Sequence, residues 1–89
     1  MMNHKIRKHF TVFVVHSDSR KAQALMEPME TAGYRCRFFS SYPSMLVEAP
    51  DDPPHILFVS AEPGVDYLKR LFKGVGEILP ETHVVVLLS

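Results

Sequence analysis

The sequence predicts a small α/β domain built on a parallel sheet with helices on both faces. Apolar runs typical of buried strands recur along the chain, and segments of helical periodicity alternate with them. This alternating order favours parallel pairing through right-handed crossovers. With 89 residues, of which 46% are hydrophobic, the chain can build one core but not two domains.

Four segments have the composition of strands. Residues 10–15 and 55–59 are apolar on both faces, so we expect them in the middle of the sheet. Residues 34–39 begin with an alternation of polar and apolar side chains, which is typical of a strand near a sheet edge. Residues 83–88 form the fourth strand, which is also apolar on both faces.

Helical periodicity marks the segments between these strands. The polar turn 16–19 supplies capping side chains for a helix over residues 20–32, in which Pro28 removes one amide donor. A short helix is expected over residues 43–47, with Ser41 or Ser44 as its cap. The last helix has apolar residues at helical spacing, namely Val65, Leu68, Leu71, Phe72, Val75 and Leu79.

The charge balance and the cysteine content indicate which partners and which cellular compartment to expect. Ten basic and ten acidic residues cancel, so neither direct nucleic-acid contact nor membrane association is expected. Residues 1–9 are read as a basic N-terminal tail ahead of a domain over residues 10–89. The single cysteine, Cys36, excludes an internal disulfide and fits a reducing compartment, so we expect the chain in the cytoplasm.

Three pieces of the sequence resemble the receiver domain of bacterial response regulators, the flavodoxin-like module of two-component signalling. They are the strand 12–15 with its polar turn and helix, the strand 54–60, and the Pro-Gly-x-Asp turn within residues 62–68, leading into the last strand. The resemblance covers residues 10–89, through the fourth of the family's five strands. It implies a three-layer sandwich with strand order 2-1-3-4, in which the fifth strand is missing.

The chain departs from the family at the positions that carry phosphotransfer. Receivers are expected to have two acidic residues at the end of the first strand and an aspartate at the end of the third, which together hold Mg²⁺ against the phosphoryl group. Here His16 and Ser17 match the first-strand positions, and Asp18 lies just beyond them. The third-strand position matches Ser60, or Val59 if the following turn sets the alignment. Neither alignment supplies a carboxylate.

These residues predict a degenerate phosphorylation pocket. His16, Ser17, Asp18 and Ser60 should meet at the carboxyl ends of neighbouring strands, where open α/β sheets bind ligands. A Ser-His-Asp hydrolase is disfavoured, because adjacent residues of one turn point in divergent directions and no glycine-rich nucleophile turn is present. We therefore expect no enzymatic activity and no cofactor. The expected function is that of a pseudo-receiver acting by protein–protein interaction or dimerisation.

A small-ligand or metal sensor is the alternative function. It would use the pocket at the strand ends, or the three histidines expected at the starts of neighbouring strands, His9, His55 and His83. Zinc prefers four ligands supported by further hydrogen bonds, and no cysteine or carboxylate stands at a suitable spacing. Scattered surface histidines are the simpler interpretation, and no metal ligand is assigned.

The fourth strand is expected to form an open edge of the sheet. Its apolar residues are Val84, Val85, Val86, Leu87 and Leu88. Because edge strands are usually charged or covered, this edge predicts a homodimer, an output domain C-terminal to residue 89, or both. The hydroxyl that acts as a switch in receivers would fall at Leu88 or Ser89.

Overall fold

Residues 10–88, which the computed structural model describes, form one parallel sheet in which the strands follow the order β2-β1-β3-β4. The predicted fold class and strand order are confirmed. The elements are β1 (Thr11–Val15), α2 (Ser19–Thr31), β2 (Arg35–Phe39), α3 (Tyr42–Glu48), β3 (Ile56–Ser60), α4 (Val65–Ile78) and β4 (His83–Leu87). The N-terminal tail and Ser89 lie outside the described residues.

Strand β1 lies inside the sheet because its side chains are apolar on both faces. Val12 and Val14 point to one face, where Ala22 of α2 packs against them. Phe13 and Val15 point to the opposite face and join the core beneath α3 and α4. All five residues of β1 are buried, which confirms its predicted central place.

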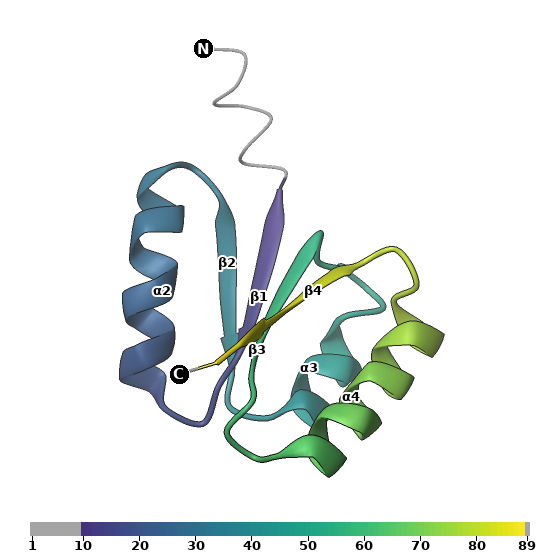
Figure 1. Cartoon of the computed structure of the whole chain (residues 1–89). Helices are drawn as coiled ribbons and strands as arrows, with labels where there is room; N and C mark the ends of the chain where they lie inside the picture. The colour runs from purple at the N-terminus through teal and green to yellow at the C-terminus, as the bar shows by residue number, and fades with distance from the viewer. Residues whose placement is uncertain (1–9, 89) are drawn as a thin grey trace.

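The helices cover the two faces of the sheet unequally. Among the described residues, helix α2 lies alone on one side of the sheet, whereas α3 and α4 pack together on the other (Figure 1). The larger cluster, under α3 and α4, includes Met45, Leu57 and Leu71. On the α2 side, Phe58 of β3 is only half-buried and Val85 of β4 is exposed. The sheet is therefore open where β3 and β4 extend beyond α2.

Two details of the helices differ from the predictions. Val65 and Phe72, placed by periodicity on the buried stripe of α4, are both exposed. They lie on the flank of the stripe, so the core side of α4 is formed by Leu71 and Val75 instead. Helix α3 begins at Tyr42, one residue before the predicted start, and of the two predicted caps Ser41 takes the N-cap position, but its side chain makes no capping bond to the backbone.

The strand register brings the carboxyl ends of the strands to one rim of the sheet. Val15 is paired with Phe39 on β2 and with Val59 on β3. Ser60 is paired in turn with Leu87 on β4. The residue after Val15 therefore stands beside Ser60, which sets the position of the candidate site. Among residues 10–88, no helix is long and apolar enough to cross a membrane.

Candidate functional site

His16 leaves β1 at the rim and is held by the turn it begins. Its backbone N–H donates to the carbonyl of Phe39 (3.1 Å), and its side chain is only 4% exposed. The backbone N–H of Asp18 donates to Nδ1 of His16 (2.9 Å). Because Nδ1 accepts this bond, the neutral ring carries its proton on Nε2, which lies 3.8 Å from Oε2 of Glu62. His16 thus shapes the turn and directs one N–H toward Glu62.

Asp18 is the N-cap of α2. Its Oδ1 accepts from the backbone N–H groups of Arg20 (3.0 Å) and Lys21 (3.4 Å), two of the donors that a helix leaves unpaired at its start. The predicted capping role of this turn therefore falls on Asp18. Ser17, the other predicted pocket residue of the turn, is exposed.

Ser60 is the last residue of β3 and is 3% exposed. Its Oγ accepts from the backbone N–H of Glu62 (3.2 Å). Val59 points instead into the core beneath α3 and α4. Of the two alignments left open by the sequence, Ser60 is the residue that stands at the rim.

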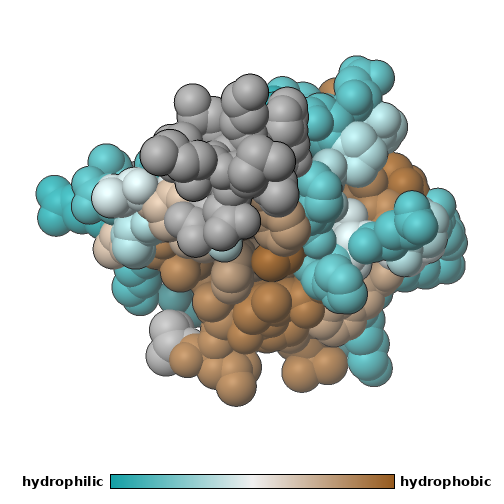
Figure 2. All heavy atoms as spheres, turned by 90° about the horizontal axis from the view of Figure 1, so that it is seen from above, coloured by the Kyte–Doolittle hydropathy of each residue, from teal (hydrophilic) through white to brown (hydrophobic). Residues whose placement is uncertain are grey.

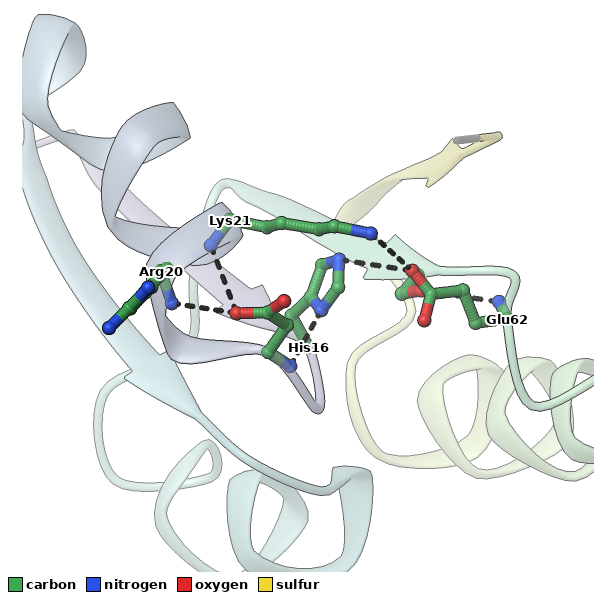
Figure 3. A network of polar contacts seen from close by, with 6 residues as sticks. His16, Arg20, Lys21 and Glu62 are labelled. Atoms are coloured by element: carbon green, nitrogen blue, oxygen red, sulfur yellow. Dashed lines mark hydrogen bonds and ion pairs between the residues drawn. The ribbon is translucent and has the colours of Figure 1, made fainter.

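A lysine and a glutamate complete the site, and the sequence reasoning missed both. Nζ of Lys21, in the first turn of α2, lies 3.3 Å from Oε2 of Glu62, in the loop after β3 (Figure 3). The pair spans the end of β1 above His16. The sequence did indicate that the turns after β1 and β3 lie at the same rim, because both strands belong to one parallel sheet. The sequence spacing of Lys21 and Glu62, however, did not distinguish them from the other charged residues of the chain.

A shallow hollow of about 260 Å³ adjoins this network. Its polar lining comes from His16 and Lys21, and its apolar lining from Leu25, Leu87 and Leu88. It lies between the start of α2 and the end of β4. A ligand in this hollow would meet the ammonium group of Lys21 and the imidazole of His16 on one side, and three leucine side chains on the other.

The predicted histidine edge forms only in part. The backbone N–H of His83 donates to the carbonyl of His55 (3.0 Å), so these two residues are neighbours. Nδ1 of His55, however, accepts from the backbone N–H of Thr11 (3.0 Å), and its ring stacks on Phe10. His9 lies outside the described residues. No group of three or more histidine, cysteine, aspartate or glutamate side chains in residues 10–88 is placed to hold a metal ion.

The strand order, the helices on both faces and the rim define a flavodoxin-like, receiver-like fold. A solved response regulator from Thermotoga maritima is similar, with a TM-score of 0.78 and 22% sequence identity. The likeness covers 86% of this chain and 64% of that one, so this chain spans less than two thirds of its length. No family model matches the sequence, and no curated protein matches it.

Proposed function

We propose that this chain is a pseudo-receiver, a signalling domain that binds a protein partner and does not undergo aspartyl phosphorylation. One observation carries the proposal. Ser60, not an aspartate, occupies the rim end of β3, where the resemblance to receivers puts the phosphoacceptor. The matching positions after β1 hold His16 and Ser17.

The chemistry of magnesium supports the proposal. Mg²⁺ needs several hard oxygen ligands, and phosphoryl transfer needs the charge on the phosphoryl group to be neutralised. Two carboxylates lie close to the rim positions, and both have structural partners. Asp18 caps α2, and Glu62 is paired with Lys21. The cap and the ion pair therefore compete with magnesium for the oxygens of these two carboxylates.

Incubation with acetyl phosphate and Mg²⁺, followed by intact-mass analysis, tests this function. We expect no added phosphoryl mass, while an active receiver domain treated in parallel gains one. Beryllofluoride with Mg²⁺ should likewise leave the melting temperature unchanged, because a ligand that does not bind the folded state cannot stabilise it. Phosphoryl mass that Asp18→Asn or Glu62→Gln removes would refute the proposal.

Sensing of a small ligand is a second candidate function, supported by the hollow beside His16 and Lys21. Its mixed lining suits a small anion with an apolar part. Thermal-shift measurements with nucleotides and with Zn²⁺ distinguish the two functions, since tight binding raises the melting temperature. A shift with nucleotides that His16→Ala removes, or a Zn²⁺ shift that His55→Ala removes, would favour the sensor.

The partner of the pseudo-receiver is proposed to be a second copy of the chain, an output domain of the same protein, or both. The open part of the sheet supports this assignment, because Val85 and Leu88 are exposed and apolar beside β3. We place this activity in the cytoplasm, which fits the unpaired thiol of Cys36.

A further inference from the structure

We propose that His16 is a proton-operated switch of the rim, in which the neutral ring holds the turn 16–18 and protonation of the ring opens it. The proposal rests on the proposed function, because it states how the same site would be regulated. It depends on one hydrogen bond. Nδ1 of His16 accepts from the backbone N–H of Asp18 (2.9 Å), and a protonated imidazole has no lone pair with which to accept.

Burial couples the charge of His16 to the shape of the turn. The side chain is only 4% exposed, so the ring has little contact with water in its present position. A proton on Nδ1 would face the N–H of Asp18, and a buried donor without an acceptor is costly. The turn must therefore change when the ring gains a proton. Histidine is the side chain that ordinarily changes charge between about pH 5 and 8, so this change belongs to that range.

The charged groups around the ring come from the turn, from α2 and from the loop after β3. Oε2 of Glu62 lies 3.8 Å from Nε2 of His16, and its negative charge favours the protonated ring. Nζ of Lys21 lies 3.3 Å from the same oxygen, and its positive charge opposes the protonated ring. The carboxylate of Asp18 accepts from backbone N–H groups at the start of α2.

The strands beside His16 present neutral groups. β2 presents the carbonyl of Phe39, which accepts the backbone N–H of His16 (3.1 Å). β3 ends with the hydroxyl of Ser60, and β4 contributes Leu87 to the hollow that His16 also lines. Glu62 is thus the group that balances a protonated ring, while the neutral ring holds the turn. Each charge state of His16 favours a different contact.

The switch reaches α2 through Asp18. The carboxylate of Asp18 caps the helix at the N–H groups of Arg20 and Lys21, so a change in the turn displaces the cap. Protonation also adds one positive charge beside the pair formed by Lys21 and Glu62. A partner that binds at the rim would therefore meet a different charge and a different start of α2 at low pH.

One substitution separates the hydrogen bond from the charge. The bond from the Asp18 N–H to the His16 side chain has the spacing of an Asx turn, in which an asparagine oxygen accepts from the N–H two residues further on. His16→Asn can therefore keep the turn while removing the titration. His83→Asn is the matched control. His83 is exposed and starts β4, at the end of the molecule that Figure 2 shows, away from the rim.

NMR titration of the full chain between about pH 5 and 8 tests the switch. The ring nitrogens of His16 should show the Nε2–H tautomer at the upper end, and the amide signal of Asp18 should move with the same midpoint as the ring. Protection of this amide against hydrogen exchange should fall about two- to tenfold, the effect of losing one hydrogen bond. The movement should be absent in His16→Asn and unchanged in His83→Asn.

Two charge variants test the balance at Nε2. Glu62→Gln should lower the midpoint of the His16 titration, because it removes the charge that balances the protonated ring. Lys21→Met should raise the midpoint, because it removes the charge that opposes it. An unchanged midpoint in both variants would overturn the assignment of Glu62 as the balancing group.

The unmodified chain alone can overturn the switch, so the test does not depend on the folding of a variant. An Asp18 amide that does not follow the His16 ring would do so, as would a ring that stays neutral down to about pH 5. The same movement of the Asp18 amide in His16→Asn would also exclude His16 as its cause. Any of these results leaves the pseudo-receiver intact when acetyl phosphate adds no mass. Phosphoryl uptake by a chain in which Asp18 follows His16 would refute the pseudo-receiver alone.

Discussion

Lys21 and Glu62 join α2 to the loop after β3, with Nζ 3.3 Å from Oε2, although 41 residues separate them in the sequence. The Lys21 and Glu62 side chains are 56% and 39% exposed, and the pair stands beside the buried ring of His16. This ion pair lies at the rim formed by the carboxyl ends of β1 and β3, which is where receivers are expected to carry acidic side chains. An exposed ion pair of this kind has a modest and salt-dependent effect.

We expect Lys21→Met to lower the free energy of unfolding by about 0.2–1 kcal/mol, the range for exposed pairs. The loss should shrink in about 1 M NaCl, where charges are screened within roughly 3 Å. Urea denaturation at low and high salt measures both effects, with Lys69→Met, on the exposed side of α4, as the control. A loss above about 2 kcal/mol, outside the range for exposed pairs, would mean that Lys21 supports more than the ion pair.

The cap of α2 gives a second prediction. Asp18→Ala should lower the free energy of unfolding by about 1 kcal/mol, because two backbone N–H groups lose their acceptor. Asp18→Asn keeps an acceptor oxygen at the same place and should cost only a few tenths of a kcal/mol, roughly the spread among good caps. Equal losses in the two variants would show that the charge of Asp18, rather than its cap geometry, stabilises the domain.

The glycines of α4 give a third prediction. A methyl group added at Gly76 meets nothing within 4 Å, so Gly76→Ala should raise the free energy of unfolding by about 0.5–1 kcal/mol. At Gly74 the added carbon would lie 3.1 Å from Cδ1 of Leu46, so Gly74→Ala should gain less. Thermal denaturation of the two variants checks the order. A larger gain at Gly74 would contradict the described packing of α4 on α3.

Cys36 gives a pH-dependent prediction. Burial, and secondarily the nearby charge of Glu30, raises the pKa of the Cys36 thiol. The folded state therefore holds this proton more tightly than the unfolded state does. The resulting stability is fully present below the pKa of an unfolded thiol, about 8.5, and is lost as the pH rises through the folded pKa.

Alkylation by iodoacetamide and alkaline denaturation both measure this effect. The folded chain should react more slowly than the urea-unfolded chain at pH 8. As the pH rises above the pKa of an unfolded thiol, Cys36→Ser should lose less stability than the unmodified chain. Burial also raises the pKa of Tyr67, so part of the alkaline loss should remain in Cys36→Ser. Equal alkylation rates in the folded and unfolded chains would contradict the shift.

Much of the fold follows from local sequence. Strands 10–15 and 55–59 are apolar on both faces, which indicated a place inside the sheet, and both lie there. The alternation at the start of β2 correctly indicated an edge. Periodicity was less exact for α4, because it gives the direction of an apolar stripe but not the width that the sheet can cover. The spacing of Phe72 therefore predicts that it belongs to the apolar stripe, although in the folded domain its side chain is exposed.

The site was predictable in its location but not in its contacts. Parallel strands must end at one rim, so the sequence alone indicated that His16 and Ser60 are neighbours. The choice between Ser60 and Val59 depended on where β3 ends, and one residue of register decides which side chain enters the core. The contact of Lys21 with Glu62 depends on loop geometry and on the rotamers of long side chains, which spacing does not encode.

The charged edge at β2 has a consequence for association. Arg35 and Arg37 are ion-paired with Asp52 and Glu48, so a strand that approached β2 would meet charged side chains in place of an apolar edge. Strand addition at this border is therefore disfavoured, and raising the protein concentration should not drive association through β2.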